Sequence, residues 1–344
     1  MTSFLLVIYF KNRKALGSGL LTALTNRAGD AVYLILLGVR LGGMGGLSHW
    51  QLVCVLVLAM TKRAQYPFSS WLPAAMAAPT PVRALVHSRT LVTAGVYVLL
   101  RYNPHEYEWL LVMGSVTMVI AGMCACAEMD LKKIVALRTL SQLGVMVVAL
   151  GLRLKELCFF HLMTHALFKA LLFLCVGVFI HNTYGGQDYR SFNGLAKAAQ
   201  GASTLAATAN LSLLGFPFLA GFFRKDLILE GSYNRRVRAL RVLMFLLGVG
   251  LTTAYRVKII NLAMPGRGTD GAAALAGGGG GRTVKAPIHL LGLGAVFGGA
   301  ALQGGSGQVS LGGVDKGLPL VIILIGAGGG VIARGVRISY LSSM

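Results

Sequence analysis

Two histidines and a lysine recur at helical spacing within one strongly apolar segment. The stretch HLMTHALFKALLF runs from His161 to Phe173, and its other residues are mostly leucine, alanine, methionine and phenylalanine. On a helix, His161, His165 and Lys169 share one face because they stand four residues apart. Imidazole changes its charge near neutral pH, and a buried lysine with a movable partner can bind and release a proton. The row therefore predicts a relay for protons.

Metal or haem binding is the alternative for the same histidine pair, since histidines at i and i+4 can chelate one ion. Lys169 stands one turn further on and would repel a cation. The remaining histidines near the ends of apolar segments form no second pair; they are His49, His105, His181 and His289. We therefore rank a metal site below a proton relay.

The composition indicates a membrane as the setting of these groups. The 344 residues are 55% hydrophobic and 12% charged, with a mean hydropathy of +0.70, whereas soluble proteins have roughly a quarter of their residues charged. The apolar runs are long enough to cross a bilayer as helices, and too long and unalternating for a β-barrel. We predict an all-α polytopic membrane protein with about ten transmembrane helices plus an N-terminal partial helix. The predicted spans are 19–39, 50–66, 77–100, 109–127, 132–151, 157–181, 201–222, 238–262, 287–303 and 317–335.

Proline interrupts two of these spans. The segment MTKRAQYPFSSWLP contains Pro67, and the segment NLSLLGFPFLAGFFRKD contains Pro217. Proline removes a backbone donor, and lipid tolerates the resulting break only where protein or water satisfies the freed groups. Two broken helices in two halves favour an inverted-repeat transport bundle, although a kink used only for packing is an alternative for each.

Ionisable residues stand next to both breaks. Lys62 precedes Pro67, and Lys225 and Asp226 follow Pro217. A charged group within a membrane span is costly, so its presence there indicates function. His87, in the segment after the first break, is a further candidate, although neighbouring hydroxyl groups could equally satisfy it.

Several long motifs resemble one family. They are KRAQYPFSSWLPAAMAAPTPVRALVHSRTLVTAGVYVLLR (62–101), DLKKIVALRTLSQLG (130–144), FFHLMTHALFKALLFLCVGVFIH (159–181) and LSLLGFPFLAGFFRKD (211–226). In this order they are similar to the antiporter-like subunits of respiratory complex I, over a stretch from residue 2 to about residue 260. The resemblance implies an inverted-repeat antiporter-like bundle. Residues 1–101 would be the remainder of the first half-channel unit, 102–262 the second unit, 263–286 a glycine-rich loop and 287–344 C-terminal transmembrane helices.

The resemblance also implies roles for the candidate residues. They would form one proton relay: Lys62, His87, His161, His165, Lys169, Lys225 and Asp226. The chain would be a proton-translocating membrane-arm subunit of NADH:ubiquinone oxidoreductase in the mitochondrial inner membrane, the bacterial plasma membrane being the alternative location. Its partners would be the lipid bilayer and other membrane-arm subunits, which would bind NADH and ubiquinone.

We expect no cofactor and no nucleic acid on this chain. No phosphate-cradling loop or cysteine cluster is present, and the basic residues are interleaved with the apolar runs. Two other functional interpretations stay open. One is a stand-alone cation/proton antiporter subunit, and the other is a non-functional fragment, truncated or mistranslated.

The truncated interpretation carries an expectation for Lys62. The resemblance implies an acidic partner upstream of Met1, so we expect Lys62 to lack a carboxylate. The nearest acid in sequence, Asp30, stands three residues after Arg27 and is expected to pair with it instead. A first unit without its acid would not cycle protons.

The arginines carry the mistranslated interpretation. The chain has 32 basic and 11 acidic residues and a net charge of +21, so few carboxylates are available for pairing. Six arginines stand where the family pattern has serine or another small residue: Arg63, Arg83, Arg89, Arg138, Arg224 and Arg256. Within a membrane core each unpaired arginine would cost at least a few kcal/mol. Many invertebrate mitochondria read as serine some codons that the standard code reads as arginine, which would explain these positions.

Overall fold

A computed structural model describes most of the chain. The described residues are 2–10, 12–41, 49–78, 91–102, 107–183, 185–188, 199–214, 227–228, 231–232, 239–263 and 282–305. Within these ranges every regular element is a helix, and the single β-type pairing is an isolated bridge between Asp130 and Asp188. The predicted all-α class is confirmed.

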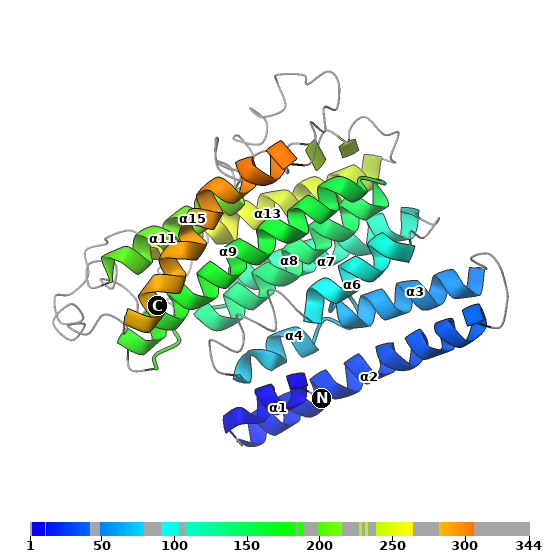
Figure 1. Ribbon diagram of the computed structural model, residues 1–344, viewed down its shortest axis with the longest axis horizontal. Helices are drawn as coiled ribbons and strands as arrows, with labels where there is room; N and C mark the ends of the chain where they lie inside the picture. Colours follow the sequence, from blue (N-terminus) through cyan, green and yellow to red (C-terminus); the bar gives the residue numbers. More distant parts are fainter. Residues whose placement is uncertain are drawn as a thin grey trace, which may run out of the picture.

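The helices lie side by side in chain order across much of the molecule, from α2 at one edge to α15 at the other (Figure 1). The first part of the chain forms α1 (Thr2–Val7), η1 (Ile8–Phe10), α2 (Arg13–Leu41), α3 (His49–Lys62), α4 (Trp71–Ala74), η2 (Ala75–Ala77) and α6 (Leu91–Tyr102). The rest forms α7 (Tyr107–Ala127), α8 (Leu131–Gly151), α9 (Lys155–Asn182), α11 (Gln200–Leu214), α13 (Ala239–Ala263) and α15 (Arg282–Gly305).

Five of the described helices are long and apolar enough to cross a membrane. They cover Arg13–Val39, Glu108–Ala127, Leu131–Gly151, Lys155–Asn182 and Arg241–Ile260. Each coincides with one of the predicted spans. The chain is therefore a multi-pass membrane protein.

Some predicted boundaries were wrong. The span predicted at 50–66 ends at Lys62, because the chain turns there, and the helix predicted from 287 begins at Arg282 and continues through Pro287. The glycine-rich loop is correspondingly shorter at its C-terminal end. The described part of the 201–222 span is α11, and the span at 317–335 lies outside the described residues.

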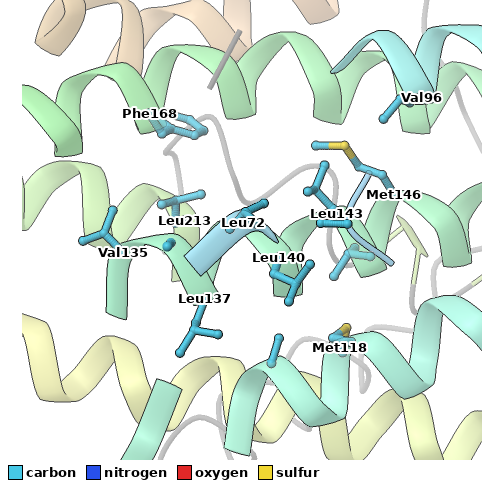
Figure 2. Packing of buried hydrophobic residues seen from close by; sticks show 14 of the residues in the cluster. Leu72, Val96, Met118, Val135, Leu137, Leu140, Leu143, Met146, Phe168 and Leu213 are labelled. Carbon is cyan, nitrogen blue, oxygen red and sulfur yellow. The ribbon is translucent and has the colours of Figure 1, made fainter. Parts of the chain in front are cut away.

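The core of the bundle is built around α8. From Ile134 to Gly151 every residue of this helix is buried, and it contacts α7, α9, α4, α6 and α13. Figure 2 shows buried side chains of these neighbours in one cluster, among them Val96, Met118 and Phe168. The helices α7 and α8 approach closely because Gly114 and Gly144 face each other, and a Cβ on Gly144 would lie 2.8 Å from the Gly114 carbonyl oxygen.

The break predicted at Pro67 is confirmed. The helix α3 ends at Lys62, and residues 63–70 form turns before α4, with Ala64 at a φ of 54°. The Trp71 indole donates a hydrogen bond to the Thr61 carbonyl (3.1 Å), and the Thr117 hydroxyl donates one to the Gln65 side chain (2.6 Å). Side chains thus satisfy part of the freed backbone, as a break inside a membrane requires. Pro217 lies outside the described residues.

Candidate functional site

The histidine–lysine row lies on one buried face of α9. His161, His165 and Lys169 are 3%, 2% and 0% exposed, which confirms the predicted arrangement on a helix. The two imidazole rings stack, with centroids 6.0 Å apart and an angle of 17° between their planes. Leucine, alanine and phenylalanine favour this helix, and Glu156 in its first turn and His181 in its last complement the helix dipole.

Lys169 is held by a carbonyl group. Its ammonium donates a hydrogen bond to the backbone oxygen of Val135 on α8, at 3.2 Å. Of the ion pairs between described residues, none includes Lys169. Its electrostatic neighbours are Arg138 on α8 and Arg256 on α13, which are cations. The most deeply buried lysine of the row therefore faces like charges.

A tyrosine lies between those two arginines. The Tyr255 ring centre is 5.6 Å from the guanidinium carbon of Arg138 and 5.8 Å from that of Arg256. The Tyr255 hydroxyl shares a hydrogen bond with the Ser141 hydroxyl at 2.7 Å. We call Ser141, Tyr255, Arg138 and Arg256 the Tyr255 cluster. Helices α8, α9 and α13 together thus enclose Lys169 in a polar environment within the core.

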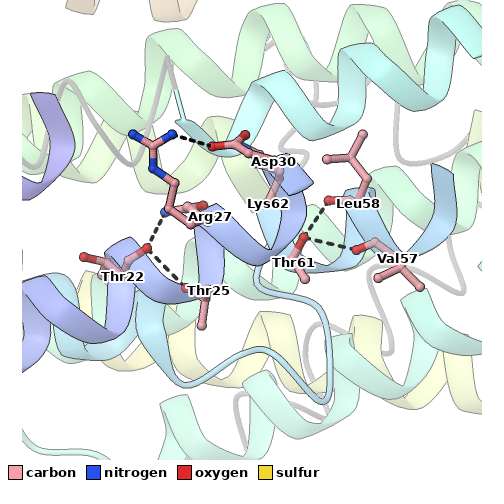
Figure 3. Close-up of polar contacts among 9 residues, drawn as sticks. Thr22, Thr25, Arg27, Asp30, Val57, Leu58, Thr61 and Lys62 are labelled. Carbon is pink, nitrogen blue, oxygen red and sulfur yellow. Dashed lines mark hydrogen bonds and ion pairs between the residues drawn. The ribbon is translucent and has the colours of Figure 1, made fainter. Parts of the chain in front are cut away.

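Lys62 occupies a second site and does have a carboxylate partner. Its ammonium donates a hydrogen bond to Asp30 on α2, and Asp30 also lies 3.9 Å from the Arg27 guanidinium (Figure 3). The prediction that Lys62 lacks a carboxylate, and that Asp30 belongs to Arg27, was therefore wrong. The reason is the close approach of α2 and α3 at Gly29, where a side chain would collide with the Thr61 hydroxyl.

A third group of charges lies where α7 gives way to α8. Lys133 pairs with Asp130 (3.0 Å) and lies 3.9 Å from Glu128. From α13, Lys258 donates hydrogen bonds to the carbonyls of Cys126 (3.0 Å) and Glu128 (2.8 Å). These contacts close the C-terminal end of α7, because the last carbonyls of a helix have no partner within it.

The structure does not test every predicted site residue. His87, Pro217, Lys225 and Asp226 lie outside the described residues, so their roles stay predictions. The division into units at residues 101 and 102 also stays a prediction. In the part of the chain that the structure describes, no three histidine, cysteine or acidic side chains come together as a metal site would require.

Sequence reasoning missed two residues of these sites, Asp30 and Tyr255. A signal for Asp30 was present, since an isolated glycine inside a helix often marks a close helix approach and Gly29 precedes Asp30. Nothing in the sequence indicated Tyr255, because its contact with Ser141 joins helices that lie far apart in the chain.

Comparison with known proteins decides the family. The family described as NADH:quinone oxidoreductase/Mrp antiporter, transmembrane, matches residues 1–252. The chain belongs to this family. The resemblance predicted from the four motifs is confirmed.

Relatives within the family carry one name. The NADH-ubiquinone oxidoreductase chain 5 of Lumbricus terrestris is 47% identical over 273 residues, which is 75% of this chain and 48% of that protein. The chain 5 of Aedes aegypti is 47% identical over 284 residues, covering 77% of this chain and 49% of that protein. The chain thus spans about half the length of the curated relatives it matches.

A solved structure shares the fold. It is described as the Mrp complex from Dietzia sp. DQ12-45-1b, and it superposes with a TM-score of 0.75 at 26% identity. The match covers 97% of this chain and 41% of that one. The antiporter-like bundle predicted for this chain is confirmed.

Proposed function

We propose that this chain forms part of a proton-translocating membrane-arm subunit of NADH:ubiquinone oxidoreductase. The observation that carries the proposal is the row of His161, His165 and Lys169, buried in the core of a chain whose relatives are chain 5 of that enzyme. A buried ionisable group within a membrane bundle is expensive to maintain and therefore favours function over packing.

The relay would use the three groups in sequence. Lys169 is the deepest of them, and its one hydrogen bond runs to the Val135 carbonyl, which can hold an ammonium or release a neutral amine. The stacked imidazoles of His161 and His165 continue the path along α9 toward its N-terminal end. Each imidazole can accept a proton on one nitrogen and give one up from the other.

Lys62 and Asp30 would form an earlier charge pair. A carboxylate that can move away from a lysine changes the proton affinity of that lysine, so the pair could couple charge movement in α2 and α3 to the central row. His87, Lys225 and Asp226 would complete the relay, as the sequence motifs imply.

The redox reaction would belong to other subunits. They would bind NADH and ubiquinone, while this chain would carry no cofactor and contribute proton movement in the mitochondrial inner membrane. Its contacts would be the lipid bilayer and neighbouring membrane-arm subunits.

Substitution of Lys169 tests the proposal. We expect Lys169→Met in an assembled complex to abolish most proton pumping and to lower the coupled NADH–quinone activity, because the central group of the relay is lost. Lys155→Met is the matched control, since Lys155 is an exposed lysine on the same helix. Pumping in membrane vesicles, measured with a pH-sensitive dye and normalised to assembled complex, reports the result. Full pumping by the Lys169 variant would contradict the proposal.

A stand-alone cation/proton antiporter is the second candidate, supported by the match to the Mrp complex. The two candidates differ in their company. We expect the natural protein to co-purify with NADH-oxidising subunits after mild detergent extraction. Purification without any NADH-oxidising activity would favour the antiporter.

A further inference from the structure

Three arginines are buried in the core of the helical bundle. Arg63, Arg138 and Arg256 are 0%, 1% and 0% exposed, and they are among the largest fully buried side chains of the described chain. Arg138 lies within the membrane-crossing helix α8 and Arg256 within α13, while Arg63 directly follows α3.

Their guanidinium groups are poorly matched by their surroundings. All three guanidinium nitrogens of Arg63, and two each of Arg138 and Arg256, are buried with no hydrogen-bond partner among the described residues. No ion pair of the described chain includes any of the three arginines. A buried charge that is neither paired nor hydrogen-bonded costs several kcal/mol in protein and more in a membrane, on order-of-magnitude estimates.

Other basic residues of the chain are accommodated in the ordinary way. Lys62 pairs with Asp30, Lys133 pairs with Asp130, and Arg241 pairs with Glu108 at 2.8 Å. The three buried arginines are therefore exceptions within this structure. Two of them flank one tyrosine ring and face Lys169, so three cations lie close together with no described carboxylate among them.

We infer that positions 63, 138 and 256 are serine in the protein that the organism makes. The codons AGA and AGG specify arginine in the standard code and serine in the mitochondria of many invertebrates. The relatives come from an earthworm and from insects such as mosquitoes and a locust. This step rests on the proposed function only in so far as it assumes a mitochondrial gene.

Serine suits the helices that carry these positions. Neighbouring hydroxyl groups on α8 and α13 donate hydrogen bonds to carbonyls three residues earlier in their own helix, as Ser141 does at 3.0 Å and Thr252 at 2.8 Å. A serine hydroxyl at 138 or 256 could do the same and would need no partner elsewhere. At position 63, a side chain without a guanidinium group would leave no buried nitrogen unmatched.

Serine would also change the environment of Lys169. Two cations would be replaced by small hydroxyl groups, which would join those of Ser141 and Tyr255 around the same space. A polar space of that size suits ordered water, whereas an apolar one would stay dry. Lys169 would then face a hydroxyl-lined site able to pass protons through water.

Peptide sequencing of the natural protein tests the inference directly. Trypsin cleaves after arginine, so an arginine at 138 would separate Ile134–Arg138 from Thr139–Arg153, whereas serine would leave Ile134–Arg153 in one piece. We expect the uncut peptide, and serine in the fragment spectra at 63 and 256. Arginine at even one of the three positions would overturn the inference. The result does not depend on activity, so it is separate from the test of the proposed function.

A stability measurement adds a second arm. The 344-residue chain with Arg63→Ser, Arg138→Ser and Arg256→Ser, produced with standard codons and purified in detergent, should unfold at a temperature higher by on the order of 5–10 °C. The control carries Arg13→Ser, Arg101→Ser and Arg153→Ser, which change the net charge equally at exposed positions. We expect its midpoint to shift by no more than about 2 °C. Equal shifts in the two variants would count against the inference.

Discussion

The two described lysine sites satisfy a buried charge in different ways. Lys62 lies near the edge of the bundle, with 22% of its side chain exposed, and a carboxylate from the adjacent helix pairs with it. Lys169 lies in the centre, fully buried, and has a backbone carbonyl in place of a carboxylate. In a partly hydrated pair, water screens the charges, whereas in the dry centre each nearby charge acts strongly. The central lysine is therefore the one whose protonation responds most to its neighbours.

Packing differs between the same two regions. The membrane-crossing part of α8 is completely buried, whereas 22% of the corresponding part of α2 is buried. Leu24, Leu34 and Ile35 of α2 are exposed, as expected for a helix surface that meets lipid or another subunit. Substitutions should consequently be far less tolerated around Lys169 than around Lys62.

The largest effect is expected at the α7–α8 contact. Gly144→Leu would force the added side chain against the Gly114 carbonyl and Met118, and we expect a loss of at least about 2–3 kcal/mol in stability. The control is Gly17→Leu on α2, where no atom lies within 4 Å of an added Cβ. Thermal unfolding in detergent compares the two variants. If both unfold at the parental temperature, the proposed contrast in packing does not hold.

Removal of the carboxylate at the edge site comes next. Asp30→Asn should lower proton pumping in the assembled complex, because Lys62 loses its charged partner. The stability cost should be only about 1 kcal/mol, since the pair is partly exposed. Glu156→Gln, at an exposed position on α9, serves as the control. Unchanged pumping at Asp30→Asn would leave the edge site without a role in transport.

The hydrogen bond inside the Tyr255 cluster should contribute moderately. Tyr255→Phe removes a buried hydroxyl contact, but Ser141 keeps its bond to the Arg138 carbonyl, so we expect a loss of about 1 kcal/mol. Tyr97→Phe is the control at a tyrosine that is 60% exposed. A larger effect at Tyr97 than at Tyr255 in thermal unfolding would argue against the cluster as a structural unit of the core.

The smallest effect is expected at Arg27. This residue lies 3.9 Å from Asp30, and its side chain is 61% exposed, so Arg27→Gln should cost less than about 0.5 kcal/mol and leave pumping intact. The comparison with Asp30→Asn separates the two partners of one carboxylate. Should the two substitutions lower pumping equally, Arg27 would be a member of the edge site rather than a bystander.

The sequence by itself determined the class of the protein and the central row. Apolar runs of bilayer length can be little else than helices, because only helices and closed barrels satisfy their backbone groups in lipid. The spacing of His161, His165 and Lys169 placed them on one helix face, since the geometry of a helix is local. The break before Pro67 was equally local, because proline acts on its own backbone, although the helix ended earlier, at Lys62.

Only the tertiary structure decided which groups meet. Asp30 stands near Arg27 in sequence, yet it bonds to Lys62, because α2 and α3 approach at Gly29. The same holds for Val135, Arg138 and Tyr255, which reach the surroundings of Lys169 from other helices. Helix faces can be predicted from periodicity, but the distance and rotation between helices depend on how all their side chains pack together. The sequence therefore determined the relay residues on α9, and packing determined their partners.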